Sequence, residues 1–173
     1  MSEAAQDRPV IFFTVGTDHH PFQRLVDWAD ELAVLLPTTR VVVQFGTARR
    51  PQHAEGFPAC AAPELAGWLA QAAVVVTQGG PGGIVEARNH GRLPIVVPRD
   101  PALGEHIDGH QLRFAAHMAG LGKIQLAAGR AELEQLVRQS LAAPLTVQGM
   151  QLRSSTSATA AAIDSRLTRL TSR

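Results

Sequence analysis

Residues 73–86, with the sequence AVVVTQGGPGGIVE, decide which fold the chain can adopt. Small and β-branched apolar residues lead into a glycine-rich turn, and an alternating apolar pattern follows it. This order predicts a buried strand, a turn and the start of a helix, with the carboxylate of Glu86 in the first helical turn. The turn would expose backbone N–H groups and the positive end of a helix dipole, which suit an anion such as a diphosphate. Because Glu86 would repel that anion, we expect it to bind ribose hydroxyl groups, which indicates a nucleoside diphosphate or a sugar nucleotide.

Apolar runs and helical patterns alternate along the rest of the chain. Strands are expected at 10–15, 41–45, 74–77, 93–97 and, at a sheet edge, 123–126. Helices are expected at 22–36, 64–71, 82–90, 110–119 and 132–141. Residues 46–63 show only weak periodicity. The alternation predicts an α/β fold, a Rossmann-like parallel sheet with helices on both faces and with ligands beyond the carboxyl ends of the strands.

Composition favours one soluble globular domain, because 173 residues with 45% hydrophobic and 18% charged side chains can build a single core. A net charge of +1 without a run of Lys or Arg argues against nucleic acid as a partner. The single cysteine, Cys60, excludes an internal disulfide and fits a cytosolic setting. We expect a flexible N-terminus at 1–9, the Rossmann-like domain at 10–145 and a Ser/Thr/Ala-rich segment with a C-terminal amphipathic helix at 146–173. The N-terminus lacks the apolar core of a signal peptide, and no apolar stretch approaches the ~20 residues that span a bilayer.

A glycine turn alone is a weak signal, since this one lacks the Gly-Lys-Ser/Thr of a P-loop and the spacing of the dinucleotide fingerprint. A second segment adds to it. The loop that follows the strand ended by Pro98 should deliver Asp108, His110 and Gln111 to the start of a helix, near the same strand ends. The combination of the two segments is therefore more specific than either one.

The adjacent His19 and His20 follow Gly16, close to the predicted phosphate position. Two histidines are candidate metal ligands, but we find no carboxylate or cysteine at ligand spacing, so the pattern favours a loop or capping role. No Asp-x-Asp pair is present either. We therefore expect no metal and no cofactor.

Taken together, the motifs resemble the donor half of GT-B glycosyltransferases, and in particular the family 28 C-terminal domain. The resemblance lies in the Gly-Gly-x-Gly-x-x-x-Glu pattern of 79–86, the Pro-ended strand and the later His-Gln pair. The segments TVGT at 14–17 and PFQRLV at 21–26 further resemble the small catalytic subunits of two-component enzymes. These include the eukaryotic subunit that adds the second GlcNAc to a dolichol-linked sugar, and bacterial exopolysaccharide counterparts. The resemblance covers residues 10–121.

This resemblance implies a role for each matching position. Residues at the donor diphosphate would be Gly16, Thr17, Gln78, Gly79, Gly80, Gly82 and Gly83. Glu86 would hold the ribose, His110 and Gln111 would contact the donor sugar, and backbone groups around Ala61 and Ala62 would bind the uracil. Two other interpretations stay open: Glu86 as a helix N-terminal carboxylate favoured by the dipole, and His110 as a polar residue at a helix start.

The chain departs from the family pattern at two positions. Gln78 stands where many relatives have a histidine, so a neutral amide replaces a donor that can carry charge. Pro81 makes the glycine turn stiffer than usual. Both changes bear on the strength of diphosphate binding.

The implied function is that of a donor-binding, catalytic subunit. A GT-B enzyme has two Rossmann-like domains, and this chain supplies one. The resemblance therefore implies an inverting UDP-sugar-dependent glycosyltransferase (a hexosyltransferase) in the cytoplasm. A membrane-associated partner subunit would recruit it to the inner face of the membrane and would supply the acceptor site, a lipid-linked glycan and the catalytic base.

Three points stay open at the level of the sequence. The chain could instead be a non-catalytic sugar-nucleotide-binding module, or half of another GT-B-fold enzyme such as a UDP-sugar epimerase. Homo-oligomerisation is also open. In the tail, the apolar stripe Ile163, Leu167 and Leu170 fits a helix packed on its own domain, a helix docked on the partner, or a frayed end.

Overall fold

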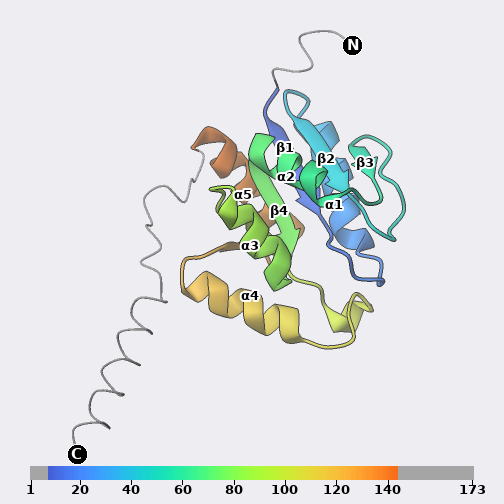
Figure 1. The fold of residues 1–173 in the computed structure, drawn as a ribbon, viewed down its shortest axis with the longest axis vertical. Coiled ribbons are helices and arrows are strands. Elements are labelled where there is room, and N and C mark those ends of the chain that lie inside the picture. Colours follow the sequence, from blue (N-terminus) through green and yellow to red (C-terminus); the bar gives the residue numbers. More distant parts are fainter. Residues whose placement is uncertain (1–7, 144–173) are drawn as a thin grey trace, which may run out of the picture.

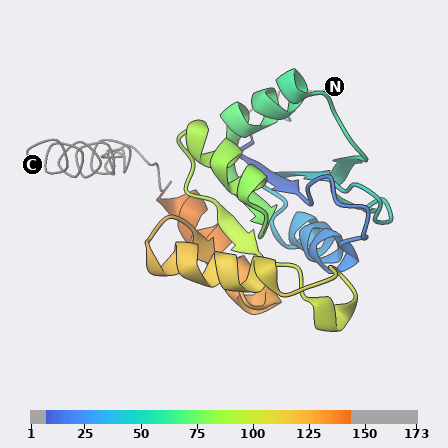
Figure 2. The same cartoon turned by 60° about the horizontal axis from the view of Figure 1, so that its bottom comes forward.

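The computed structural model describes residues 8–143, which form a three-layer α/β fold with one parallel sheet between two layers of helices (Figures 1 and 2). The sheet has six strands in the order β3-β2-β1-β4-β5-β6. The strands are β1 Val10–Thr14, β2 Arg40–Gln44, β3 Glu55–Phe57, β4 Ala72–Gln78, β5 Ile95–Val97 and β6 Gln125–Leu126. The helices are α1 Gln23–Leu35, α2 Ala62–Gln71, α3 Pro81–Asn89, the short 3-10 helix η2 Pro101–Leu103, α4 His110–Gly120 and α5 Arg130–Ala142. The predicted Rossmann-like α/β fold is confirmed.

Both faces of the sheet are buried, as the uninterrupted apolar runs of the strands require. On one face, Ile11 and Phe13 of β1 join the core that α1 and α5 cover. On the other face, Phe12 packs with Trp68 of α2, and Val96 of β5 packs among residues of α3 and α4. Successive side chains of a strand point to opposite faces, so a single apolar run serves both layers.

Each predicted helix and strand is present within a few residues of its expected position, and β6 is the expected edge strand. The position of Glu86 within its helix differs from the prediction. Because α3 begins at Pro81, Glu86 is its sixth residue and lies in the second turn, so its predicted place in the first turn is wrong.

Strand β3, in the weakly periodic segment 46–63, was missed by sequence reasoning. It has three residues, one of them a glycine, and among the strands within residues 8–143 it pairs only with β2. Contacts from distant segments hold it: Arg40 forms an ion pair with Glu55 at 2.6 Å, and Phe57 stacks on Phe12 and Trp68. Local sequence carries none of this information.

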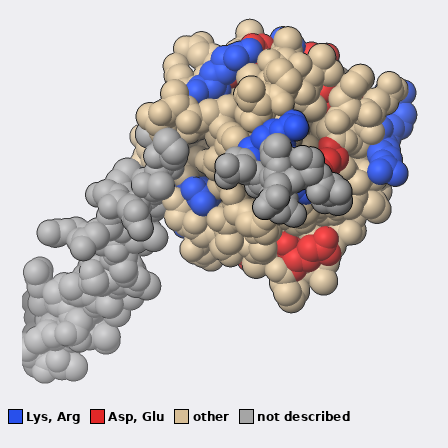
Figure 3. All heavy atoms as spheres, turned by 90° about the horizontal axis from the view of Figure 1, so that it is seen from above, with Lys and Arg blue, Asp and Glu red and all other residues tan. Residues whose placement is uncertain are grey.

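The predicted amphipathic helix within 146–173 and most of the predicted N-terminal segment 1–9 lie outside the described residues. In the part of the chain that the structure describes, no helix is both long and apolar enough to cross a membrane. Figure 3 views the molecule from above, and on this face Lys and Arg side chains form small separate groups rather than one basic stripe.

Candidate functional site

A pocket of about 380 Å³ lies where three neighbouring strands end. Thr14, Gln44 and Gln78, from the ends of β1, β2 and β4, line its floor. The loop after β1, the start of α3 and one side of α2 complete the lining, through Gly16, Thr17, Ala59, Cys60, Leu65, Leu69, Gly80, Pro81, Gly82, Gly83 and Glu86. The carboxyl edge of a parallel α/β sheet is the usual position of a ligand site, and the volume suits a small molecule.

The first turn of α3 lines this pocket. Gly80 is the N-cap, and Gly82 and Gly83 follow Pro81 in the first helical turn. First-turn N–H groups have no partner within their own helix, and the helix dipole adds positive potential there. The predicted glycine turn and helix start are therefore formed, with Gly82 and Gly83 in the pocket lining, and anion binding there stays a prediction.

Close packing explains why these positions are glycines. A Cβ atom at Gly83 would lie 2.4 Å from Oγ1 of Thr77, which is fully buried and has no hydrogen-bond partner among the described residues. A Cβ at Gly79 would lie 3.1 Å from the backbone oxygen of Gln111. Gly79 thus lets the turn pack against α4, and it is buried rather than part of the pocket lining.

Gln78 bridges the two glycine segments of the site. Its Oε1 accepts a hydrogen bond from the N–H of Gly80 at 2.7 Å. Its Nε2 lies where a side chain of Gly16 would be, 2.7 Å from an ideal Cβ, and Gly16 also has a positive φ of 76°. Because Oε1 is held by the turn, the N–H groups of Nε2 remain as donors on the pocket side.

The carboxylate of Glu86 lines the same pocket from the second turn of α3. The side chain is exposed and has no hydrogen bond or ion pair within residues 8–143. The effect of a helix dipole falls off within the first turn, so this position weakens the interpretation of Glu86 as a dipole-stabilised carboxylate.

His110 and Gln111, predicted at the donor sugar, lie outside the pocket lining. His110 is mostly exposed, and its Nδ1 lies 2.7 Å from Oδ2 of Asp108. Oδ1 of Asp108 accepts a hydrogen bond from the backbone N–H of His110 at 2.9 Å. Gln111 packs on Gly79 and its Oε1 accepts the N–H of Arg99 at 3.2 Å. The structure thus places Gln111 beside the glycine turn and His110 next to it at the start of α4, and their role toward a sugar stays a prediction.

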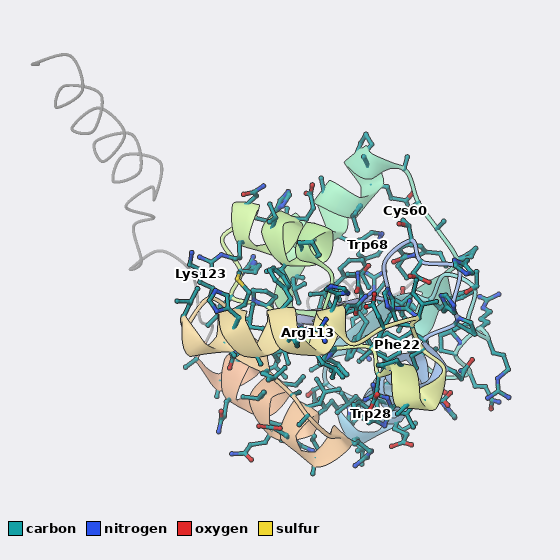
Figure 4. The ribbon with its side chains drawn as sticks, turned by 90° about the horizontal axis from the view of Figure 1, so that it is seen from below. Phe22, Trp28, Cys60, Trp68, Arg113 and Lys123 are labelled. Atoms are coloured by element: carbon teal, nitrogen blue, oxygen red, sulfur yellow. The ribbon has the colours of Figure 1, made fainter. Side chains whose placement is uncertain are left out.

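The predicted uracil positions also lie at the edge of the site. Ala61 is the N-cap of α2 and Ala62 its first residue, while the neighbouring Ala59 and Cys60 line the pocket. Figure 4 shows Cys60 on the segment that leads into α2. Burial, followed by the charge of Glu64, raises the pKa of the Cys60 thiol.

Arg99 is a buried residue that sequence reasoning did not single out. Its Nη1 donates to the carbonyls of His20 at 2.7 Å and Glu105 at 3.0 Å, and its Nη2 donates to that of Val15 at 2.9 Å. Burial lowers the pKa of Arg99, against the opposing effect of the Asp18 and Glu105 carboxylates. One guanidinium therefore ties the end of β1 to the loops before α1 and α4.

Glu105 extends this network to α1. Both of its oxygens accept from Arg24, at 2.8 Å and 2.7 Å, and Oε2 also accepts the N–H of Asp100 at 2.8 Å. The guanidinium of Arg24 lies over the ring of Trp28. Figure 4 shows Trp28 and Phe22 close to η2. The available sequence signal for this network was Arg99, two residues after the buried strand β5, but the sequence does not show that this arginine is buried.

A cluster of histidines surrounds Asp18 beside the pocket. His20 Nδ1 lies 2.7 Å from Asp18 Oδ1, and His106 Nε2 lies 3.4 Å from Asp18 Oδ2. Burial raises the pKa of Asp18, but hydrogen bonds from His20 and the charge of Arg99 outweigh it, and the pKa lies below its usual value. The sequence-based statement that no carboxylate stands at ligand spacing from His19 and His20 is wrong, because Asp18 directly precedes them.

The strand order, the helices on both faces and the position of the pocket define a Rossmann-like half-domain of the GT-B type. The model of the glycosyltransferase family 28 C-terminal domain matches residues 10–166, and the chain belongs to this family. A comparison with curated proteins gave no match.

Solved structures share the fold at low sequence identity. The glycotransferase of kitacinnamycin superposes with a TM-score of 0.64 at 22% identity, over 83% of this chain and 37% of its own. The calicheamicin glycosyltransferase CalG4 has a TM-score of 0.58 at 20% identity, over 80% of this chain and 35% of its own. The spinosyn forosaminyltransferase SpnP has a TM-score of 0.58 at 17% identity, over 84% of this chain and 39% of its own. This chain therefore spans little more than a third of the length of these glycosyltransferases.

Proposed function

We propose that the chain is the donor-binding, catalytic subunit of an inverting UDP-sugar-dependent glycosyltransferase. It would act with a separate, membrane-associated subunit that binds a lipid-linked glycan acceptor. The observation that carries the proposal is one pocket that combines first-turn N–H groups of α3 with the carboxylate of Glu86. Membership in family 28 and the shared fold of the glycosyltransferases support it.

The spacing of these groups fits a nucleoside diphosphate. Gly83 and Glu86 are three residues apart on α3, so they are separated by about 4.5 Å along the helix axis. A diphosphate at Gly82 and Gly83 would therefore place its ribose beside Glu86. Thr17 and the Nε2 group of Gln78 would donate to the phosphate oxygens from the other side of the pocket.

The two ends of the donor would lie at the edges of the pocket. The uracil would contact the backbone near Ala61 and Ala62, next to the lining residues Ala59 and Cys60. The sugar would extend past the buried Gly79 toward the start of α4, where His110 and Gln111 lie. The identity of the sugar depends on these last contacts and on the partner.

In the proposed reaction, a hydroxyl of the acceptor attacks the anomeric carbon from the face opposite to UDP. The bond between this carbon and the diphosphate oxygen breaks, and a base on the partner takes the hydroxyl proton. Negative charge then develops on UDP, where the N–H groups of α3 stabilise it. We expect no metal ion in this step, because backbone donors and the dipole supply the positive potential.

The aligned region covers 37% and 35% of two of the structural neighbours, and the proposed partner would supply the acceptor site. Recruitment by such a partner would bring the chain to the cytoplasmic face of the membrane. Homo-oligomerisation remains an alternative arrangement.

Calorimetry with UDP, UDP-GlcNAc, UDP-glucose and UDP-glucuronate tests donor binding. We expect binding of UDP and of one UDP-sugar, and a loss of about 10- to 100-fold for Glu86→Ala, since a hydrogen bond to a charged group contributes about 1.5–3 kcal/mol. Glu64→Ala is the matched control, because Glu64 is an exposed helical carboxylate outside the pocket lining.

The outcomes separate the candidate functions. If no uridine nucleotide binds, with or without the partner, the proposal fails. Binding without sugar transfer in the reconstituted complex would favour a non-catalytic module. Conversion of the UDP-sugar to an isomer would favour an epimerase half. An unchanged affinity in Glu86→Ala would remove the ribose role of that residue.

A further inference from the structure

Beside the donor pocket, three imidazoles approach the carboxylate of Asp18. The distances are 2.7 Å from Oδ1 to His20 Nδ1, 3.8 Å from Oδ1 to His19 Nδ1 and 3.4 Å from Oδ2 to His106 Nε2. Asp18, His19 and His20 each offer one ligand atom, and these three atoms all lie within 4.8 Å of one another. None of the four residues lines the donor pocket.

The cluster joins two loops that are distant in the sequence. Asp18, His19 and His20 come from the connection between β1 and α1, and His106 comes from the connection between β5 and α4. Arg99 hydrogen-bonds the backbone carbonyls of His20 and Glu105, so the backbone on both sides of the cluster is held in place. This preorganisation reduces the ordering that a bound ion would require.

The two ring nitrogens of His106 face two different aspartates, Asp18 and Asp108. The Nδ1 of His106 lies 3.3 Å from the backbone oxygen of Asp108, 3.4 Å from Oδ1 and 3.3 Å from the backbone nitrogen of the same residue, so it donates or accepts according to the tautomer. A histidine that binds a metal through one ring nitrogen typically donates its other N–H to a carboxylate or a carbonyl, which fixes the tautomer. Asp108 can play that role and leave Nε2 of His106 free to face Asp18.

We propose that Asp18, His19, His20 and His106 bind one divalent transition-metal ion of the zinc type. With metal–ligand bonds of about 2.0–2.1 Å, ligand atoms at the corners of a tetrahedron lie about 3.3–3.4 Å apart. The distances from the Asp18 oxygens to the three imidazole nitrogens, 2.7, 3.4 and 3.8 Å, bracket that value. Asp18, His19 and His20 form the group within 4.8 Å of one another, and His106 would join it by rotation of its side chain. Three imidazoles and one carboxylate suit zinc, whereas Mg²⁺ prefers sites made of oxygen ligands.

The ion would link the two loops rather than take part in sugar transfer. Thr17, which lines the donor pocket, directly precedes Asp18, and His106 lies shortly before the start of α4. A metal cross-link would therefore stabilise the segments that carry Thr17 and His110. This proposal does not depend on the identity of the donor.

Isothermal titration of the EDTA-treated, tag-free chain with Zn²⁺ tests the proposal. We expect one equivalent of Zn²⁺ to bind, no binding of Mg²⁺, and a rise of the melting temperature with Zn²⁺. Asp18→Asn and His20→Ala should each weaken Zn²⁺ binding at least 10-fold. His106→Ala should weaken it less, because His106 faces the second oxygen of Asp18.

His19→Ala keeps the test valid if a buried variant fails to fold. The His19 side chain is 86% exposed, so its removal should leave the fold intact and still weaken Zn²⁺ binding. His53→Ala is the matched control, since His53 also pairs with an aspartate, Asp30, at 3.0 Å but in a different part of the molecule. Absence of stoichiometric Zn²⁺ binding, or equal affinity in the His19, His20 and Asp18 variants and the wild type, would overturn the proposal. Neither result would bear on UDP binding.

Discussion

Replacement of Gly83 by alanine should destabilise the chain, whereas the same replacement at the neighbouring Gly82 should not. Both glycines lie in the first turn of α3. A Cβ at Gly83 would lie 2.4 Å from Oγ1 of Thr77, far inside the contact distance of carbon and oxygen, while a Cβ at Gly82 has no atom within 4 Å. Thr77 is on the central strand β4 and is fully buried, so it has little room to move away.

The size of the effect follows from this pair of positions. Alanine in place of glycine favours a helix by about 0.8–1 kcal/mol, and this gain is common to both variants. Overpacking a buried site costs about 1–3 kcal/mol. The free energies of unfolding of Gly82→Ala and Gly83→Ala should therefore differ by about 1–3 kcal/mol, with Gly83→Ala the less stable.

Urea denaturation followed by circular dichroism measures this difference. In a Thr77→Ala background the hydroxyl is gone, so adding Gly83→Ala should cost little, and the double-mutant cycle should give a coupling of about 1–3 kcal/mol. Thr77→Val keeps the bulk of the side chain, so in that background Gly83→Ala should remain costly. Equal stabilities of Gly82→Ala and Gly83→Ala would refute this account of the turn.

Three further predictions concern charged and titratable groups. Glu105→Gln removes a buried carboxylate that accepts hydrogen bonds from Arg24, so we expect the free energy of unfolding to fall by about 2–3 kcal/mol. The control Glu64→Gln, at an exposed carboxylate, should cost almost nothing, and equal losses in the two variants would contradict this prediction. Burial raises the pKa of Asp30, but the N–H groups that donate to its carboxylate outweigh burial, so the net shift of the pKa is downward. The ionised Asp30 therefore stabilises the folded state above about pH 4, and this stabilisation is lost as the pH falls through the lowered pKa. The stability advantage of the wild type over D30N, measured by urea denaturation, should accordingly be constant near neutral pH and shrink in acid. The raised pKa of Cys60 should make its alkylation by iodoacetamide slow at neutral pH and faster in base. Because Cys60 lines the pocket that we propose to bind UDP, UDP should protect it; mass spectrometry measures both effects.

The architecture was predictable because its signals are local. Uninterrupted apolar runs such as Val41–Val43 belong to parallel strands buried on both faces, and Pro81 and the glycines mark a strand-to-helix turn. The one missed strand, β3, depends on pairing with β2 and on Arg40 and Phe12 from elsewhere in the chain.

The candidate site was predictable only in part, for the same reason. Glu86 and the glycine turn are close in sequence, and they do line one pocket. The Arg99 network and the approach of His106 to Asp18 join segments far apart in the chain, so no spacing rule could reveal them.

The sequence by itself determined the alternation of strands and helices, the glycine turn and the family, since each depends on the order of neighbouring residue types. Only the tertiary structure decided that Glu86 lies in the second turn of α3 and that Gln78 spans the space beside Gly16. Only the tertiary structure, too, showed that Asp18 lies among three imidazoles. The physical reason is that the carboxyl ends of parallel strands bring separate loops to one edge, where distances and burial depend on packing across the whole sheet.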